Sequence, residues 1–338
     1  MIKAGKFRFH LRRLYLLPVS AAAASWLIFA GTGSDGAAEA QNPGPAPFPV
    51  SANFADEEQK NVFSYALESG FMRISFANMA AGRAHAAAQK SSKAQAAAGA
   101  DKQIYGLIAM ELKPGWKTYW RNPGTSGFAP KIELDGGARA EILFPVPQLF
   151  REPGEEWSYG YKTHIMLPFR LILPWQQQNF YSGTLTIGIC ETLCMPQKIP
   201  FRFSTSIVDN DKEKAGIAAA LATVPKAANK NFQLLSARTI TGGLRLVLRY
   251  PQNRGEEAPH LFLDGGDMQI GLAVPVASPG KNRQSALNRV KKPLQIYQAP
   301  LLLDEAEIGA PIAYIAVLKN GEAVSGTVRV EAPRADKP

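Results

Sequence analysis

Two cysteines at the turn of a predicted β-hairpin constrain this chain more than any other feature. They are Cys190 and Cys194, the only cysteines among the 338 residues, and they lie in the segment GTLTIGICETLCMPQKIPFRFS that begins at Gly183. On both sides of them apolar residues alternate with polar or small ones: Leu185, Ile187 and Ile189 before, and Ile199, Phe201 and Phe203 after. Alternation with a period of two around a short polar loop predicts antiparallel strands with one buried face. The cysteines are therefore expected where the chain reverses direction, at the edge of a sheet.

The spacing of the pair leaves its role open. A disulfide that closes five residues stabilises a fold by roughly 2 kcal/mol, whereas one that closes fifteen contributes about 3 kcal/mol. Short loops also favour strained bridges, which are easily reduced. Against a redox role, three residues between cysteines are a weaker signal than the two of a Cys-x-x-Cys motif on a helix. The spacing is therefore compatible with a structural disulfide and with a redox-active pair.

Residues 1–40 have the pattern of a cleavable export signal. Five Lys and Arg residues precede a mostly apolar run, Leu14–Ala30, and Ala38-Glu39-Ala40 offers a small-x-small cleavage site. The alternative, a retained membrane anchor, is disfavoured because Pro18 and Ser20 interrupt the run. We expect a periplasmic protein that does not span the membrane after cleavage, in a compartment where disulfides form and persist.

The remaining length exceeds what one core usually supports, so two domains are expected. Residues 41–70 are expected to be a flexible lead-in, within which Glu57–Leu67 is a candidate short helix. Short predicted strands separated by turn residues fill 71–208 and predict an immunoglobulin-like sandwich. An Ala-rich insertion at 79–100 has no apolar stripe, and we expect a mobile loop or a frayed helix there.

A short helix and further strands are predicted in the last third of the chain. Residues 209–229 form a helical connector, with Asp209 or Asn210 as its cap and apolar residues at helical spacing: Ile217, Ala220 and Leu221. Residues 230–333 return to alternation and include an Asn320-Gly321 hairpin turn. The predicted fold class is all-β, with two immunoglobulin-like β-sandwich domains joined by this connector.

Several function classes lack support in the composition. The net formal charge of +10 is scattered rather than concentrated, and a concentrated basic face is what nucleic-acid binding requires. Histidines are few and widely spaced, so we expect no zinc site. Without a Gly-rich phosphate loop between a strand and a helix, we expect no cofactor. A Cu(I) site made of Cys190, Cys194 and Met195 remains an alternative, because thiolate and thioether sulfurs suit that ion.

Aromatic residues are dense in two further motifs, GWKTYWRNPGTSG and SYGYKTHIMLPF. They either pack in the core or frame the cysteine pair; the candidates for framing are Trp116, Tyr119, Trp120, Tyr159 and Tyr161. Exchange requires an accessible and partly ionised cysteine. Glu191 would disfavour a thiolate, and Lys198 or a tyrosine hydroxyl would favour one.

Taken in order and spacing, these two motifs and CETLCMP resemble the N-terminal periplasmic domain of DsbD thiol:disulfide interchange proteins, and more closely their suppressor-of-copper-sensitivity (ScsB) relatives. The resemblance spans Phe71–Ser206. It implies an immunoglobulin-like domain in which Cys190 and Cys194 are the redox couple. Cys194 would form the mixed disulfide with a partner and Cys190 would resolve it.

The resemblance also implies partners. A separate membrane electron transporter of the DsbD or CcdA type would reduce the pair, because full-length relatives carry a transmembrane region that this chain lacks. The reduced pair would act as a protein-disulfide reductase on periplasmic thioredoxin-like proteins, in cytochrome c biogenesis or copper tolerance. The chain departs from the best-known DsbD domain in having three residues, not five, between its cysteines. A non-catalytic adaptor with a structural disulfide and a Cu(I)-handling protein are the alternatives.

Overall fold

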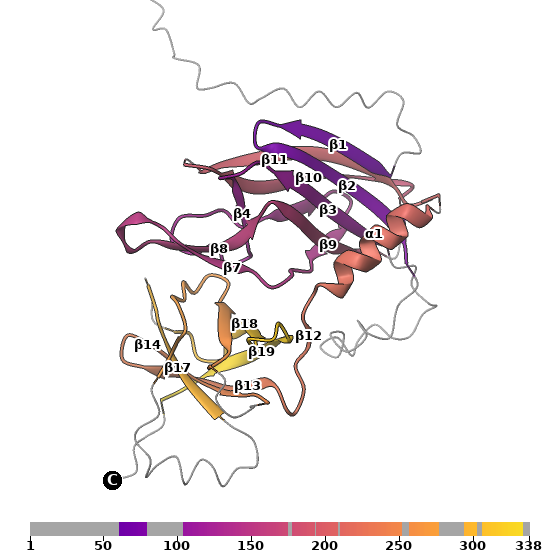
Figure 1. Cartoon of the computed structure of the whole chain (residues 1–338). Coiled ribbons are helices and arrows are strands. Elements are labelled where there is room, and N and C mark those ends of the chain that lie inside the picture. Colours follow the sequence, from indigo (N-terminus) through magenta and orange to yellow (C-terminus); the bar gives the residue numbers. More distant parts are fainter. Residues whose placement is uncertain are drawn as a thin grey trace, which may run out of the picture. The chain divides into compact units, whose positions relative to one another are not determined.

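The computed structural model describes residues 61–79, 104–174, 178–192, 194–208, 210–251, 257–276, 294–302 and 306–333. All of them belong to one compact unit, Val50–Pro338. The expected signal, most of the lead-in and nearly all of the Ala-rich insertion lie outside these ranges. Strands dominate the described part, which has one α-helix, α1 (Asp211–Ala222) (Figure 1). The predicted class, all-β with two immunoglobulin-like sandwiches and a short helix between them in sequence, is confirmed.

Two sheets form the first sandwich. Their strand orders are β1-β2-β3-β9-β6 and β11-β10-β4-β8-β7, and β5 also pairs with β10. The first sheet consists of β1 (Val62–Leu67), β2 (Gly70–Asn78), β3 (Ile104–Leu112), β9 (His164–Ile172) and β6 (Arg139–Ile142). The second consists of β11 (Cys194–Ser204), β10 (Phe180–Cys190), β4 (Lys117–Tyr119), β8 (Trp157–Lys162), β7 (Gln148–Arg151) and β5 (Lys131–Leu134). A 3₁₀ turn, η2 (Pro153–Glu155), connects β7 to β8.

Strand β1 corrects one expectation. The candidate helix at Glu57–Leu67 is wrong for its described part, because Val62–Leu67 pairs antiparallel with β2, placing Phe63 opposite Ile74. Phe63 and Tyr65 are buried while their neighbours are not, which is the period-two burial of a strand. The sandwich therefore begins before Phe71.

The core of the first sandwich lies between its two sheets. Phe76 on β2 stacks on Phe203 of β11, with ring centroids 4.7 Å apart, and Tyr181 of β10 also stacks on Phe203, at 5.7 Å. All three side chains are buried. Aromatic pairs at these separations contribute packing energy beyond the burial of their area. The hairpin that carries the cysteines is thus fixed at its base.

Helix α1 packs on the outer face of the first sandwich. Asn210 caps it, accepting hydrogen bonds from the backbone N–H groups of Lys212 and Glu213, as the capping preference of asparagine predicts. Its buried residues Ile217 and Ala220 contact β2 and β3 through Ala77, Tyr105 and Leu107. An ion pair joins Arg73 of β2 to Glu213. The predicted connector is therefore a docked element.

The second sandwich is built from one continuous sheet. The order is β15-β18-β19-β13-β14-β17-β16, with β12 paired to β19 in parallel. The strands are β12 (Lys226–Ala227), β13 (Gln233–Ile240), β14 (Gly243–Arg249), β15 (His260–Asp264), β16 (Val274–Pro275), β17 (Leu294–Pro300), β18 (Pro311–Val317) and β19 (Ala323–Glu331). Strand β19 pairs with β18 along most of its length and with β13 at its end. Residues of both halves share one core, so the sheet folds over on itself as a sandwich.

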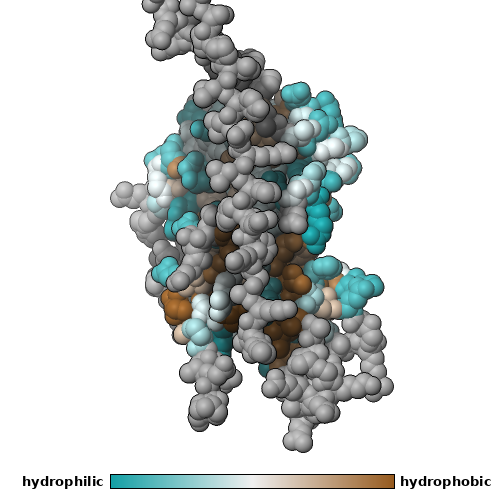
Figure 2. All heavy atoms as spheres, turned by 90° about the vertical axis from the view of Figure 1, so that its left-hand side faces the viewer, coloured by the Kyte–Doolittle hydropathy of each residue, from teal (hydrophilic) through white to brown (hydrophobic). Residues whose placement is uncertain are grey.

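Some large apolar side chains remain exposed, among them Phe128, Met195, Val274 and Ile308. Figure 2 shows one face of the molecule, where apolar residues (brown) gather between hydrophilic ones (teal). Single exposed apolar residues are normal on a protein surface. Within the described ranges no helix has the length and apolar character needed to cross a membrane.

Candidate redox site

The cysteine pair closes the predicted hairpin. Strands β10 and β11 pair antiparallel along their full lengths, and the register places Cys190 directly opposite Cys194. The two residues form a disulfide, with their Cα atoms 4.5 Å apart. The hairpin expected from alternation is confirmed, because Leu185, Ile187, Ile199 and Phe201 are all buried.

The two sulfur-bearing residues differ in exposure. Cys190 is only 1% exposed, since β10 lies inside the sheet and Cys190 also pairs with Lys117 of β4. Cys194 begins the edge strand β11 and is half-buried, and the turn residues Glu191 and Thr192 are exposed. The disulfide is therefore accessible from the Cys194 side and not from the Cys190 side.

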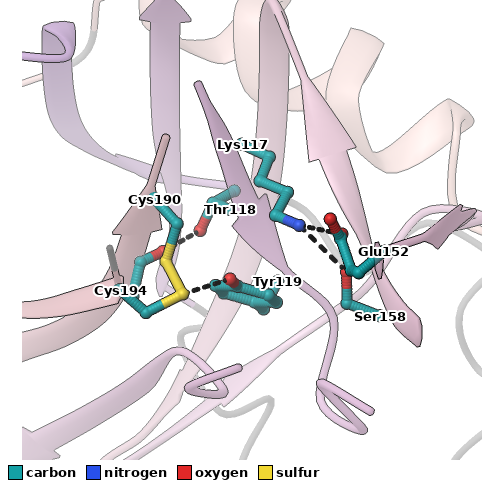
Figure 3. The surroundings of a disulfide bond; sticks show 8 residues. Lys117, Thr118, Tyr119, Glu152, Ser158, Cys190 and Cys194 are labelled. Carbon is teal, nitrogen blue, oxygen red and sulfur yellow. Dashed lines mark hydrogen bonds and ion pairs between the residues drawn. A yellow bond between two sulfur atoms is a disulfide. The ribbon is translucent and has the colours of Figure 1, made fainter. Parts of the chain in front are cut away.

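The Tyr119 hydroxyl lies against the disulfide. It is 2.7 Å from Cys194 Sγ, and because a disulfide sulfur carries no proton, the hydroxyl is the donor (Figure 3). Burial, together with the nearby Glu152 carboxylate, raises the pKa of Tyr119 to about 12. The hydroxyl therefore stays protonated, and able to donate, throughout the neutral range.

Two glycines make the slot that holds the Tyr119 ring. A Cβ atom added at Gly127 would lie 2.4 Å from the ring, and one added at Gly188 would lie 3.1 Å from the ring and 2.9 Å from Phe128. Contacts under 3.0 Å force a neighbouring group to move. The loop between β4 and β5 thus covers Tyr119, and Gly188 of β10 supports it from the other side.

A partly buried ion pair lies beside Tyr119. Lys117 shares the face of β4 that carries Tyr119, because side chains two residues apart in a strand point the same way. Its ammonium pairs with Glu152 and donates to Ser158 Oγ at 3.3 Å. The hydrogen bond from Lys117 lowers the pKa of Glu152. Figure 3 shows the Lys117 ammonium directed away from the disulfide, toward Glu152 and Ser158, so its charge is neutralised there.

Lys117 was not among the residues predicted from the sequence to influence the thiolate. Those were Lys198, which is exposed on β11, and an unspecified tyrosine hydroxyl. The signal for Lys117 was its position between aromatic residues of GWKTYW, two residues before Tyr119. A charged residue in that alternation is buried only with a partner, and the partner Glu152 is distant in sequence.

The five aromatic candidates occupy different places. Tyr119 contacts the disulfide. Trp120 and Tyr159 pack edge to face in the core, with centroids 5.9 Å apart. The Tyr161 hydroxyl donates to the Pro145 carbonyl at 2.9 Å, and Trp116 packs half-buried at the border of the core. Burial raises the pKa of both Tyr159 and Tyr161.

The residues considered for copper do not converge. Consecutive residues of a strand point to opposite faces, so Met195 is directed away from the face that carries Cys194. Met195 also pairs with Ile189, on the core side of the hairpin. Among the residues that the structure describes, no three His, Cys, Asp or Glu side chains are grouped as metal ligands would be.

Comparisons with known proteins agree with this site. Residues 84–204 match the family model described as thiol:disulfide interchange protein DsbD, N-terminal. The structure is similar to the crystal structure of the N-terminal periplasmic domain of ScsB from Proteus mirabilis, with a TM-score of 0.59 and 18% sequence identity, over 78% of this chain and 94% of that chain. No curated protein sequence matches. The structural likeness shows a shared fold, and residues 84–204, which match the DsbD N-terminal family model, include both cysteines.

Proposed function

We propose that this protein is a periplasmic thiol:disulfide exchange module that transfers electrons through Cys190 and Cys194. The observation that carries the proposal is the Tyr119 hydroxyl, 2.7 Å from the more exposed sulfur of the pair. A disulfide that serves only stability has no use for a proton donor at its accessible end. The match of residues 84–204 to the DsbD N-terminal family model supports the same function.

The reaction begins with the reduced pair. The Cys194 thiolate attacks one sulfur of a partner's disulfide, a mixed disulfide forms, and the partner's other sulfur leaves with the electron pair and takes up a proton. The Cys190 thiolate then attacks the Cys194 sulfur and releases the partner's first sulfur, which is also protonated. Two electrons and two protons have passed to the partner, and the Cys190–Cys194 disulfide is restored.

The unequal burial of the two cysteines supports these roles. Cys194 is half-buried on an edge strand and meets the partner, whereas Cys190 is buried and attacks only within the molecule. A thiolate at Cys194 accepts a charge-assisted hydrogen bond from Tyr119, which is stronger than the bond to a neutral sulfur. This bond lowers the pKa of the thiol and increases the nucleophilic fraction at neutral pH.

Two protein partners complete the cycle. We propose that a separate membrane electron transporter of the DsbD or CcdA type supplies a dithiol that reduces the disulfide, and that thioredoxin-like periplasmic proteins accept the electrons. The similar ScsB domain is described as periplasmic, and the predicted signal at 1–40 agrees with export. The exchange site lies in the first of the two predicted domains, which span 71–208 and 230–333 and are joined by the connector 209–229.

An exposed phenylalanine adjoins the site. Phe128 is 46% exposed, and its Cβ and carbonyl oxygen are each 2.9 Å from the position that a Cβ atom at Gly188 would take. Aromatic residues are enriched where proteins meet. We propose that Phe128 contacts the incoming partner beside Cys194.

Trapping tests this function. In a Cys190→Ala variant the mixed disulfide cannot be resolved, so incubation with an oxidised thioredoxin-fold disulfide isomerase should give a covalent adduct that dithiothreitol removes. The matched Cys194→Ala variant, whose remaining thiol is buried, should give little adduct. If neither variant forms an adduct, or if both form it equally, the proposed exchange or its assignment to Cys194 is wrong. Phe128→Ser should slow adduct formation without slowing reaction with a small disulfide.

A further inference from the structure

Four consecutive residues connect the disulfide to the second sandwich. Tyr119 contacts Cys194, and the three residues that follow, Trp120, Arg121 and Asn122, all contact strand β15. Strand β15 belongs to the sheet of the second sandwich. The peptide that positions the donor at the sulfur is therefore the same peptide that the second sandwich holds.

Phe262 of β15 packs into the core of the first sandwich. Its ring meets Trp120 at 6.2 Å and Tyr159 at 4.9 Å between centroids, both edge to face. Phe262 and Ile315 of β18 are buried with the first core, whereas Leu261 and Leu263, which flank Phe262 in β15, belong to the second core. The indole N–H of Trp120 is buried and makes no hydrogen bond in the described part of the chain. Aromatic packing therefore fixes the position of this side chain.

Polar contacts hold the next two residues. The Arg121 guanidinium lies 3.4 Å from the Asp264 carboxylate and 4.9 Å from the centre of the Trp120 ring. The Asn122 amide donates to the Leu263 carbonyl at 2.8 Å, and its oxygen accepts from the backbone N–H of Gly124 at 3.1 Å. Strand β15 thus also fixes the start of the loop that covers Tyr119.

We propose that strand β15 of the second sandwich positions Tyr119 against Cys194, so that the second sandwich sets the reactivity of the disulfide, with Phe262 as the main positioning residue. This inference rests on the proposed exchange function. Functional groups must be held within about 0.5 Å and 10–20° of their productive geometry, so a displacement of Tyr119 by about 1 Å weakens its bond to the thiolate. Trp120 follows Tyr119 directly in the chain, so a shift in the backbone of Trp120 also shifts that of Tyr119.

The test compares Phe262→Leu with Phe232→Leu in the full chain. Phe232 is buried in the core of the second sandwich, away from the first, so its replacement controls for lost stability. The measurement is the equilibrium constant of the Cys190/Cys194 pair with dithiothreitol, at a pH above the pKa of the Cys194 thiol. We expect Phe262→Leu to make reduction about threefold to tenfold less favourable, where tenfold corresponds to about 30 mV, and Phe232→Leu to have no such effect. Equal shifts in the two variants, or no shift in Phe262→Leu, overturn the inference.

A double-mutant cycle separates positioning from general loosening. If Phe262 acts through Tyr119, its replacement has no further effect on the equilibrium constant in a Tyr119→Phe background, because the donor is already absent. A shift of the same size in both backgrounds overturns the inference.

A milder variant covers the case in which Phe262→Leu does not fold. Asp264→Asn keeps the volume of the side chain but removes the charge that pairs with Arg121, and Glu331→Gln is the control, since it removes an ion pair with Arg238 elsewhere in the second sandwich. Asp264→Asn should shift the equilibrium constant in the same direction by about twofold, and an effect no larger than that of the control contradicts the inference. The dithiothreitol measurement needs no protein partner. A wild-type pair that resists reduction would therefore refute the proposed function, whereas a reducible pair that is insensitive to β15 would refute only this inference.

Discussion

Replacing Tyr119 with phenylalanine removes the hydroxyl 2.7 Å from Cys194 Sγ and leaves the ring in its slot between Gly127 and Gly188. After reduction the same hydroxyl donates to a thiolate. A hydrogen bond to a charged group contributes about 1.5–3 kcal/mol, against about 0.5–1.5 kcal/mol for a neutral pair. The difference, on the order of 1–1.5 kcal/mol, corresponds to about one pKa unit. We therefore expect the pKa of the Cys194 thiol to rise by about one unit, and reduction to become about tenfold less favourable at a pH above that pKa.

The assay uses a Cys190→Ala background, in which Cys194 is the sole thiol. The rate of alkylation by iodoacetamide is measured as a function of pH, and its midpoint gives the pKa of Cys194. Tyr161→Phe is the matched control, because it also removes one hydroxyl, which donates to the Pro145 carbonyl 2.9 Å away. An unchanged midpoint in Tyr119→Phe, or an equal rise in Tyr161→Phe, would refute the role given to Tyr119.

Three further outcomes are expected. Gly127→Ala puts a Cβ atom 2.4 Å from the Tyr119 ring, so it should raise the pKa of Cys194 as Tyr119→Phe does. The control, Gly216→Ala, whose Cβ has its nearest neighbouring atom at 3.8 Å, should leave that pKa unchanged. An unchanged alkylation midpoint in Gly127→Ala would contradict the role given to Gly127 in holding the ring. Phe203→Ala removes the ring stacked on Phe76 and should lower the free energy of unfolding in urea by about 3–5 kcal/mol; a loss below about 1 kcal/mol contradicts the packing described. Because the fold raises the pKa of Tyr119 from 10.0 to about 12, the stability that this raised pKa contributes is complete below pH 10 and is lost as the pH rises through about 12. The difference in tyrosinate absorbance between wild type and Tyr119→Phe should therefore have its midpoint near pH 12, and a midpoint near pH 10 would contradict the shift.

The hairpin was predictable because its signal is local. Apolar residues at every second position from Leu185 to Phe203, interrupted by two cysteines in a short polar loop, define both strands and their register. Strand β1 was missed because its local signal is weak. Its alternation rests on Phe63 and Tyr65 alone, and the Glu residues before them favoured a helix.

The periodicity of apolar residues does not predict contacts between segments that are distant in sequence. Tyr119 was one of five aromatic candidates, and only the pairing of β4 between β10 and β8 places its hydroxyl on Cys194. The partner of Lys117 is 35 residues away, at Glu152. Phe262 lies in an unbroken apolar run, Leu261–Leu263, and nothing in that run indicates that its ring belongs to the core of the other sandwich. Sequence patterns identify which face of a strand is buried, but not which core covers it.

The reduction potential of the Cys190/Cys194 pair in the wild-type chain tests the central claim most directly. It is obtained by equilibrating the full chain with dithiothreitol or glutathione buffers at neutral pH and quantifying free thiols. A pair that exchanges electrons with thioredoxin-like proteins should have a potential between about −270 and −120 mV, the range of known exchange proteins. A potential below about −300 mV would identify an inert structural disulfide and contradict the proposed function.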